Sequence, residues 1–490
     1  MAVHPSLLRL EDKTALLAGW VVPMSGPPVA EAAVIISGTK ITAIVSQDEL
    51  TQMGPVDQER QSASSPAKDD WRRWFQSVHD YGDAVIVPGL INLHTHLDNS
   101  FLQGFNNQAR MFDWVRGLME ARAGWSGEKW WQSTLEGAHQ AALAGTSLVV
   151  DNSYSGLSLA ALASTGLRGV VALELFGLRD DQAEDDWQQW LQRMEPLQNQ
   201  ASDPVRLALG DGKLKLTVAP HAPYTVCPTL WQKAQKWAAK NGTPVCAHVS
   251  ESLEECRWLA SEDQTLDRFH QFVRTTPGRS KIHEPEAMPS WAGQGLSPVQ
   301  HLDRYGLIDE NLLAAHAVHL HSDDISVIAG RQGKIACCPR SNARLGNGQA
   351  PLAAMLAAGI TVGFGTDGLA STDDLSLLSE ARFALDQRLG LDQPSKSPSG
   401  LPSGSFNLTS QAALAAVTIE SAKALGLDHI VGSLDPGKSA DIAVFKTRAR
   451  GRQATDNPFD QLIEGQTELE ALLVAGEFVV KNGKLVLERR

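Results

Sequence analysis

Cysteine is scarce in this sequence, and long hydrophobic runs are absent. The five cysteines form no CxxC pair and no regular framework: they are Cys227, Cys246, Cys256, Cys337 and Cys338. Scattered cysteines are typical of a reducing compartment, where they are mostly small buried hydrophobic residues. No apolar stretch reaches the roughly 18 residues that a membrane-spanning helix needs. The first residues also lack the basic segment and apolar run of a secretory signal, so we expect a cytoplasmic protein without a membrane partner.

Basic residues are outnumbered, which excludes further classes of function. With 43 Lys and Arg against 56 Asp and Glu, the formal net charge is -13. Nucleic acids select basic surfaces, so no nucleic-acid partner is expected. A hydrophobic content of 43% with 20% charged residues indicates a soluble globular protein with a sizeable core. The 490 residues are too many for one ordinary domain.

Both ends of the chain are rich in short strand patterns. The predicted strands lie at 15–22, 33–37, 41–45, 442–445, 472–474, 477–481 and 484–487. One small β-sandwich domain built from residues 1–83 and 430–490 accounts for both groups. Within it, the polar segment 51–82 is interpreted as an insertion.

The middle of the chain, 84–429, alternates between strand and helix patterns. Eight apolar segments predict strands at 84–96, 147–152, 169–176, 213–220, 244–249, 312–318, 334–338 and 360–365. Most are continuous runs of Val, Ile, Leu and Ala, as expected for parallel strands buried on both faces. The sequence therefore predicts an α/β fold, a (β/α)8 TIM-type barrel with insertions.

The first barrel strand ends in a His-x-His pattern. His94 and His96 are two residues apart, so in a strand both imidazoles lie on one face, where a single metal ion could bind them. Taken alone, such a pair is solvent-exposed about as often as it binds metal. The other strand ends decide between these interpretations.

Polar residues also follow other strands of the predicted barrel. His221 follows the fourth strand, His248 and Glu251 the fifth, His316 lies on the sixth, and Asp367 follows the eighth. Active sites of such barrels lie at the carboxyl ends of the strands, so these side chains are expected to converge. Each residue alone has an ordinary structural explanation, but their joint occurrence favours a site.

Three imidazoles and one carboxylate form the predicted ligand set: His94, His96, His248 and Asp367. This set suits one divalent ion, Zn²⁺ first and Fe²⁺ as the alternative, with a position left for an activated water. Glu251 would donate a proton, Asp367 would accept one, and His316 would orient or polarise the reacting oxygen. The sequence thus predicts a hydrolytic metal site.

Five ordered motifs then reveal a family resemblance. They are PGLINLHTH at 88–96, HAPYT at 221–225, AHVSE at 247–251, AHAVH at 315–319 and GTDG at 365–368. Together with GSLDPGKSADI at 432–442, they resemble the amidohydrolase superfamily, and within it the triazine hydrolase and S-adenosylhomocysteine deaminase branch. The segments CPRSN at 338–342 and TDGLAS at 366–371 look most like aminofutalosine deaminases.

The resemblance implies a metal-activated water that attacks an aromatic carbon bearing an amino group. It implies the same four ligands, the same acid and base residues, and substrate contacts from His221 and Trp114. One position departs from the branch: adenosyl deaminases carry a ribose-binding Glu nine residues after the tryptophan, and here Ala123 occupies that place. The resemblance also suggests a homodimer.

Three functions follow as hypotheses. The first is hydrolytic deamination of a purine-like or other N-heteroaromatic amine, including an adenosine-type nucleoside, with release of ammonia. The second is opening of a cyclic amide, or displacement of chloride or alkylamine from a triazine-like ring, because hydroxide attack needs the same residues. The third is a non-catalytic barrel scaffold, which the complete set of predicted ligands disfavours.

Overall fold

The computed structural model describes residues 12–52, 70–105, 110–199, 202–261, 265–275, 289–387, 408–448 and 456–486. The chain falls into two compact units. One comprises Met1–Ile91, Ala142–Ser147 and Gly426–Arg490, and the other comprises Asn92–Ala141 and Leu148–Leu425. We propose these units as the two domains of the protein.

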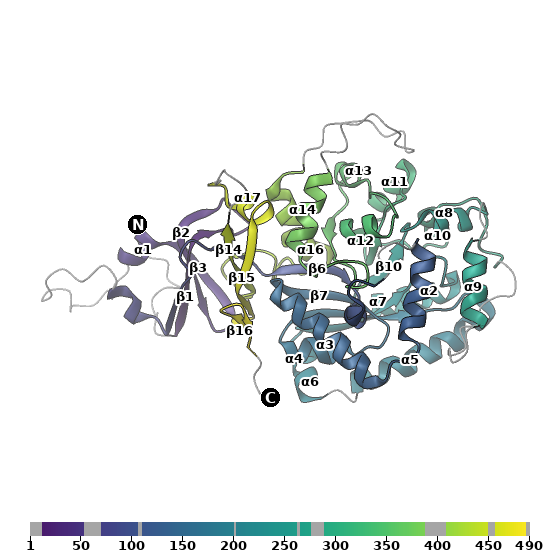
Figure 1. The fold of residues 1–490 in the computed structure, drawn as a ribbon, viewed down its shortest axis with the longest axis horizontal. Coiled ribbons are helices and arrows are strands. Elements are labelled where there is room, and N and C mark those ends of the chain that lie inside the picture. The colour runs from purple at the N-terminus through teal and green to yellow at the C-terminus, as the bar shows by residue number, and fades with distance from the viewer. Residues whose placement is uncertain are drawn as a thin grey trace, which may run out of the picture. The chain divides into compact units, whose positions relative to one another are not determined.

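The larger unit is built on eight parallel strands in sequential order, β6 to β13 (Figure 1). The strands are β6 (Leu90–Thr95), β7 (Thr146–Ser153), β8 (Arg168–Leu175), β9 (Leu214–Pro220), β10 (Val245–Val249), β11 (Leu312–His316), β12 (Lys334–Cys337) and β13 (Val362–Phe364). Every residue of β7 and of β8 is buried, which explains why these strands carry apolar runs rather than an alternating pattern. The predicted (β/α)8 barrel is confirmed.

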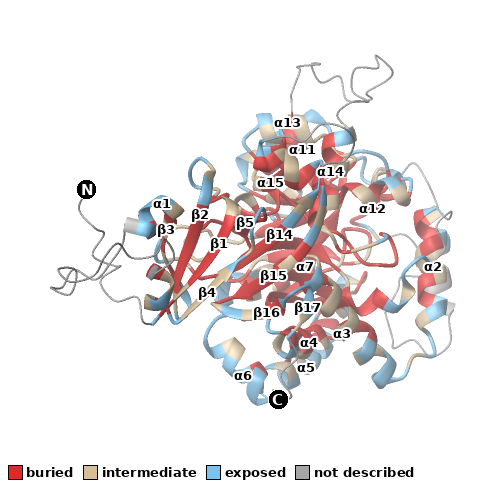
Figure 2. Cartoon of the chain, turned by 60° about the vertical axis from the view of Figure 1, so that its left-hand side comes forward, coloured by how far each residue is buried: buried red, intermediate tan, exposed pale blue. Residues whose placement is uncertain are grey.

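Helices follow the strands, and Figure 2 shows exposed residues on the outer helices, for example on α6 (Asp203–Gly210). They are α2 (Met111–Arg122), α3 (Gly127–Leu143), α4 (Ser158–Thr165), α5 (Ala183–Asn199), α6 (Asp203–Gly210), α7 (Pro228–Asn241), α8 (Leu253–Leu259), α9 (Thr265–Thr275), α10 (Pro298–Arg304), α11 (Ser322–Gly330), α12 (Pro339–Arg344), α13 (Leu352–Ala357), α14 (Leu377–Gln387), α15 (Ser410–Ala416) and α16 (Ile419–Ala424). Short 3-10 turns lie at Leu97–Leu102 and Asp180–Gln182. Helix α7 illustrates the local signals, with Pro228 in its first turn and Gly242 in a left-handed conformation after its end.

Side chains join the first barrel strand to the segment after the last one. The Nδ2 of Asn92 donates to the Thr366 hydroxyl at 2.7 Å, and its Oδ1 accepts from the Thr366 backbone N–H at 3.1 Å. The Asp367 N–H donates to the His94 carbonyl at 3.0 Å. Gly365 permits this approach, because a Cβ there would lie 2.7 Å from the Cβ, N and O atoms of His94.

Replacing Gly365 with alanine is therefore expected to damage both the fold and the site. The added methyl group must displace the His94 backbone, and such overpacking costs about 1–3 kcal/mol. We expect a lower melting temperature and reduced metal retention. Gly330→Ala is the matched control, because a Cβ at Gly330 meets nothing within 4 Å. Equal melting temperatures for the two variants would contradict this account.

The smaller unit contains one nine-stranded sheet formed by both ends of the chain. Its strands are β1 (Lys13–Val21), β2 (Val29–Ser37), β3 (Lys40–Ser46), β4 (Ser77–Asp80), β5 (Val85–Pro88), β14 (Ile442–Arg448), β15 (Gln466–Val474), β16 (Glu477–Lys481) and β17 (Lys484–Leu485). Helices α1 (Gln47–Gln52) and α17 (Pro458–Ile463) accompany it. The predicted small β domain from both chain ends is confirmed.

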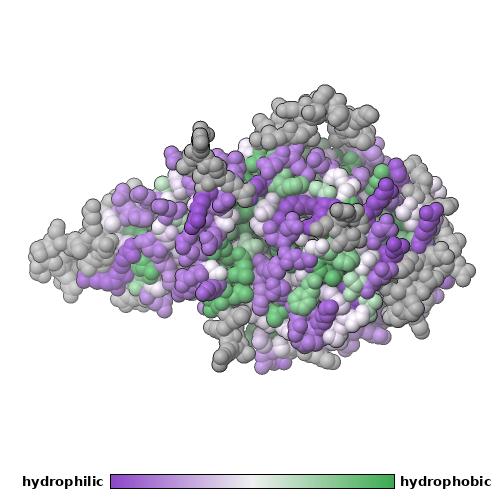
Figure 3. Space-filling model, in the orientation of Figure 1, coloured by the Kyte–Doolittle hydropathy of each residue, from purple (hydrophilic) through white to green (hydrophobic). Residues whose placement is uncertain are grey.

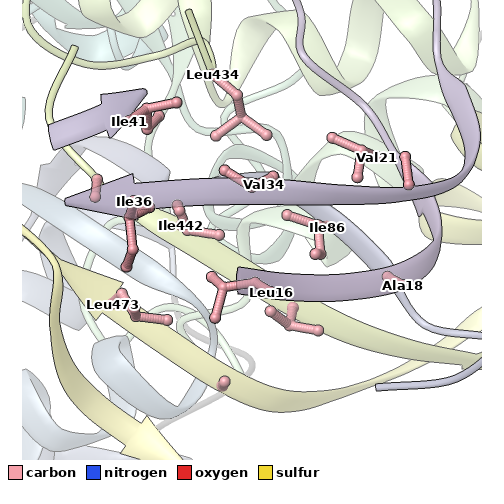
Figure 4. Close-up of a cluster of buried hydrophobic side chains, with 14 of the residues drawn as sticks. Leu16, Ala18, Val21, Val34, Ile36, Ile41, Ile86, Leu434, Ile442 and Leu473 are labelled. Carbon is pink, nitrogen blue, oxygen red and sulfur yellow. The ribbon is translucent and has the colours of Figure 1, made fainter. Parts of the chain in front are cut away.

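Side chains from most of these strands enclose a common core. Leu16, Val34, Ile86, Ile442 and Leu473 belong to it, as Figure 4 shows. The intervening residues of β1 and β2 point to the opposite face, where they pack in a second cluster. Both faces are thus apolar, which explains the dense hydrophobic runs at the two chain ends.

Two predictions about this region need correction. The predicted strand 84–96 is two strands, because β5 pairs with β14 in the small sheet whereas β6 begins the barrel. Pro88, which has no N–H, and Gly89 lie where the chain leaves one sheet for the other. The described part of the predicted insertion 51–82 also contributes to the fold: β4 pairs with β1, and the 3-10 turn Asp70–Trp74 supplies Trp71 to the second cluster. Residues 53–69 lie outside the described part.

Figure 3 shows a face on which hydrophilic residues predominate and hydrophobic residues form smaller patches. Among the described residues, no helix is both long enough and apolar enough to cross a membrane.

Candidate metal centre

The predicted site residues gather at the carboxyl ends of the barrel strands. His94 lies on β6 with His96 just after it, His248 lies on β10, His316 ends β11 and Asp367 follows β13. The centre of the His94 ring lies 4.9–5.2 Å from the ring centres of His96, His248 and His316. The structure thus brings together side chains from four strands that are far apart in the sequence.

Two imidazoles are held with their Nε2 atoms facing each other. The Nδ1 of His96 donates to the Asn152 carbonyl at 2.8 Å, and the Nδ1 of His248 donates to the His221 carbonyl at 2.8 Å. Since a carbonyl only accepts, both Nδ1 atoms carry hydrogen, and in the neutral rings both Nε2 atoms keep a lone pair. These Nε2 atoms are 3.1 Å apart. Two lone pairs at that distance repel, so a proton or a metal cation must lie between them.

Two further donor atoms point to the same centre. The buried Nε2 of His94 has no hydrogen-bond partner among the described residues. Asp367 directs Oδ1 to the centre, 3.7 Å from the Nε2 of His94 and 3.6 Å from that of His96. Its other oxygen accepts hydrogen bonds from the hydroxyls of Ser341 and Ser371, each at 2.6 Å. The carboxylate is therefore fixed with one oxygen free to bind a cation.

This donor set fits a divalent metal ion. Ligand atoms of His94, His96 and Asp367 lie within 4.8 Å of one another, and so do those of His94, His248 and His316. His316 is thus also close enough to be a ligand. Imidazole nitrogens and a carboxylate oxygen suit divalent ions of borderline softness, such as Zn²⁺. The single carboxylate neutralises only one of the two positive charges of such an ion.

The backbone around the centre is strained at three strand ends. Ser250, His316 and Asp367 have φ values of 54°, 70° and 57°, in the left-handed region that residues other than glycine seldom adopt. Such strain is concentrated at functional sites, where the surrounding structure enforces it. It turns the His316 and Asp367 side chains to their positions in the centre.

Burial and neighbouring charges favour the metal-binding protonation states of His94, His248 and Asp367, but not that of His96. Burial, reinforced by the neighbouring imidazoles, lowers the pKa of both His94 and His248 well below the usual range. Burial alone would raise the pKa of Asp367, but the imidazoles of His96 and His316 reverse this and lower it. For His96, Asp367 and Glu174 outweigh the effect of burial and raise the pKa. A proton on His96 would thus occupy the position that a cation could take.

Glu251 is held at the edge of this centre as a buried carboxyl. It is 3% exposed, and its Oε1 lies 3.7 Å from the Nε2 of His316 and accepts from the Asn347 side chain at 3.2 Å. Burial first, and then the negative charge of Asp367, raises the pKa of Glu251 to about 8. The group is therefore protonated at neutral pH and able to donate a proton.

Glu255 holds the Glu251 backbone in place, a contact that the sequence analysis missed. Its carboxylate accepts from the N–H of Ser250 at 3.1 Å and from the N–H of Glu251 at 2.8 Å. Glu255 is fully buried in the first turns of α8. It therefore fixes the direction in which the Glu251 side chain leaves the backbone.

Replacing Glu255 with alanine is expected to reduce activity without removing the metal. The two N–H groups would lose their acceptor, and the Glu251 carboxyl would no longer be held in one position. Misplacement of about 1 Å can lower the rate about 100-fold. The measurement is kcat beside metal content, with the less buried Glu254→Ala as control. An unchanged kcat would show that Glu255 does not position Glu251.

The two predicted substrate contacts lie in different surroundings. His221 follows β9, its Nδ1 is 2.9 Å from the Thr225 hydroxyl, and burial lowers its pKa to about 3. Its other ring nitrogen forms no hydrogen bond with a described residue. Trp114 lies on α2 and donates from Nε1 to the Ala370 carbonyl at 3.3 Å, beside the segment that carries Asp367. Substrate contact by either residue stays a prediction, and Ala123 is exposed at the end of α2.

Several residues around the centre were not predicted. Asn342 accepts from the Nδ1 of His316 at 2.8 Å, and Asn347 reaches Glu251 across 96 residues of sequence. No local pattern marks these contacts. Glu174 could have been found, because it is a charged residue near the end of a predicted barrel strand.

Fold and site together define a metal-dependent hydrolase of the (β/α)8 type. The model of the amidohydrolase family matches residues 85–486, so the chain belongs to the amidohydrolase family. The predicted membership and the predicted class, a hydrolase of carbon–nitrogen bonds other than peptide bonds, are confirmed.

Curated relatives cover most of the chain. It is 27% identical over 445 residues to a 5-methylthioadenosine/S-adenosylhomocysteine deaminase of Symbiobacterium thermophilum, covering 89% of this chain and 85% of the relative. It is 28% identical over 421 residues to a 5'-deoxyadenosine deaminase of Methanothermobacter thermautotrophicus, covering 84% and 86%.

Solved structures show the same fold. An adenosine deaminase from Xanthomonas campestris with bound zinc matches with a TM-score of 0.74 at 23% identity, over 98% of this chain and 95% of that one. A triazine hydrolase from Arthobacter aurescens matches with a TM-score of 0.72 at 22% identity, over 98% of this chain and 97% of that one. The Helicobacter pylori aminofutalosine deaminase with methylthio-coformycin matches at 0.69, with 21% identity over 95% and 100%.

Proposed function

We propose that this enzyme hydrolytically deaminates an adenosine-type nucleoside, replacing the amino group of the purine with oxygen and releasing ammonia. The observation that carries the proposal is the buried Glu251 carboxyl beside converging imidazoles and one carboxylate oxygen. Deamination needs a proton for the ring nitrogen and the leaving amine, and Glu251 holds one at neutral pH. The names of the curated relatives support the adenosine-type substrate.

The ligands of the metal would be His94, His96, His248 and Asp367, and we propose zinc as the ion. Bound there, the ion would supply a water molecule activated for attack near neutral pH. The zinc bound in the Xanthomonas campestris adenosine deaminase supports this choice over Fe²⁺.

The chain's own residues would move the protons and orient the ring. Glu251 would protonate the ring nitrogen beside the reacting carbon and then the departing amine. Asp367 would accept the proton that the water gives up, because its Oδ1 faces the centre. The neutral imidazole of His316, fixed by Asn342, would orient the reacting oxygen. His221 would contact the heterocycle through its free ring nitrogen.

Activity is expected to fall as the pH rises through about 8. The proton donor must be protonated, and the pKa of Glu251 is raised to about 8, so the active form is present below this value and lost above it. The measurement is kcat/KM from pH 6 to 10, with metal content checked at each pH. A kcat/KM that stays constant up to pH 10 would contradict a protonated Glu251 as the donor.

The experiment that tests the function is a screen with zinc-loaded enzyme that measures ammonia release and identifies the organic products by mass spectrometry. The panel holds adenosine, 5'-deoxyadenosine, 5-methylthioadenosine, adenine, aminopyrimidines, cyclic amides and chlorotriazines. We expect ammonia and the corresponding hypoxanthine nucleoside from the adenosine-type compounds. Product only from the cyclic amides or chlorotriazines would favour the second hypothesis and contradict the proposal. The cytoplasmic location and the homodimer stay predictions.

A further inference from the structure

Glu174, near the end of β8, is a buried carboxylate to which no role has been assigned so far. Its side chain is 8% exposed, and it makes no hydrogen bond with any residue that the structure describes. Its Oε1 atom lies 4.0 Å from the Nδ1 atom of His96, which is the upper limit for an ion pair. That Nδ1 already donates to the Asn152 carbonyl. A buried carboxylate without donors is costly, so this one is suited to a ligand that supplies them.

The surroundings of Glu174 connect the metal centre with the surface. Arg193 donates to the backbone carbonyls of Glu174 at 2.9 Å and Tyr154 at 2.6 Å. The guanidinium groups of Arg122 and Arg193 each lie 5.8 Å from the centre of the Tyr154 ring, which is 49% exposed. The cluster therefore reaches from a predicted metal ligand to solvent.

The charges of this cluster limit which ligand groups Glu174 can accept. Arg122 donates through Nη1 to the Asn99 side chain at 2.8 Å, and with Arg193 it places positive charge near the carboxylate. A cationic ligand group would be repelled by these two guanidinium groups. Neutral hydroxyl groups would not be repelled, and they donate hydrogen bonds that a carboxylate accepts.

For a substrate that reacts beside Glu251, Glu174 would lie toward the non-reacting end. Glu251 follows β10, and β9 with His221 lies between β10 and β8 in the sheet order. A heterocycle whose reacting carbon lies beside Glu251 and which contacts His221 would extend its substituent toward β8. That substituent would meet Glu174 on its way to the surface.

We propose that Glu174 accepts hydrogen bonds from sugar hydroxyls of the substrate and thereby makes the enzyme select ribosides over deoxyribosides and free bases. The inference rests on the proposed nucleoside deamination and adds a specificity-determining residue to it. Glu174 would act in binding and not in proton transfer, because Glu251 already provides the proton donor of the proposed reaction.

The test compares Glu174→Gln with wild type on adenosine, 2'-deoxyadenosine, 3'-deoxyadenosine and adenine, with zinc-loaded enzyme. Glutamine keeps the shape but replaces one acceptor with a donor. We expect kcat/KM for adenosine to fall about 100-fold, mainly through KM, with little change for adenine. The preference for adenosine over the deoxynucleosides should collapse toward one. Glu120→Gln, an exposed carboxylate on α2, is the matched control and should keep the preference.

Two results would overturn the inference. One is an unchanged preference in Glu174→Gln. The other is an equal loss on all four substrates together with weaker zinc retention, which would place Glu174 in support of His96. If no compound of the panel releases ammonia, the proposed function fails separately. Calorimetric titration of zinc-loaded wild type and variant with adenosine and adenine then decides, and equal affinity losses for both ligands, or none, would also overturn the inference.

Discussion

Replacing Glu251 with glutamine is expected to lower kcat by about 1,000-fold while leaving the metal bound. The amide has nearly the same shape but cannot give up a proton to the ring nitrogen or the leaving amine. The metal should remain, because Glu251 lies outside the predicted ligand set and its contacts are to Asn347 and His316. Steady-state ammonia release and elemental analysis of the same preparation provide the measurement.

The stability of this variant separates a catalytic effect from unfolding. The pKa of Glu251 is raised from 4.5, the value expected in the unfolded chain, to about 8 in the folded protein. The contribution of Glu251 to folding stability is therefore complete below pH 4.5 and is lost as the pH rises through about 8. Above that pH the wild type carries a buried charge that glutamine lacks, so the variant should melt at an equal or higher temperature. Glu254→Gln, on helix α8 just after Glu251 and less buried, is the control. Full activity in Glu251→Gln would rule out its role as the proton donor.

Replacing Asp367 with asparagine is expected to abolish both metal binding and activity. The carboxylate supplies the only negative charge in the predicted ligand set, and Ser341 and Ser371 hold its second oxygen. The asparagine amide removes this charge. Its NH₂ group either faces the metal, to which it cannot bind, or faces the two serine hydroxyls, whose hydrogen bonds it cannot accept. Removing a residue that only supports a metal ligand typically lowers metal affinity by roughly 10- to 100-fold. Removing a ligand together with its charge should lower the affinity at least as much.

The control for this variant is Asp373→Asn. The Asp373 side chain is 84% exposed and pairs with Arg344 near the same segment, so its loss should leave metal and activity unchanged. Asp367→Asn protein that retains wild-type metal content would show that Asp367 is not a ligand.

The fold was largely predictable because its signals are local. Buried parallel strands require continuous apolar runs, and eight such runs separated by helical segments allow few arrangements other than a barrel. His94 and His96 were predictable for the same reason, since the two-residue period of a strand places them on one face. The strand ends then indicated where His248, His316 and Asp367 would converge.

The remaining features depend on contacts that no local pattern records. The division of the predicted strand at Pro88 depends on pairing with β14, which lies more than 350 residues later in the sequence. The contact of Asn347 with Glu251 and the left-handed conformation of His316 arise only in the assembled barrel. Glu174 lies near a strand end, but no histidine stands beside it in the sequence to mark it as part of the site.

The most direct test of the metal-dependent mechanism is zinc titration of chelator-treated enzyme, followed by ammonia release from adenosine. The account predicts negligible activity without metal, and a linear gain that ends at about one zinc ion per chain. Glu251→Gln should bind the same amount of zinc without gaining activity. Ammonia release that persists in metal-free enzyme, or a chain that binds no zinc, would contradict the account.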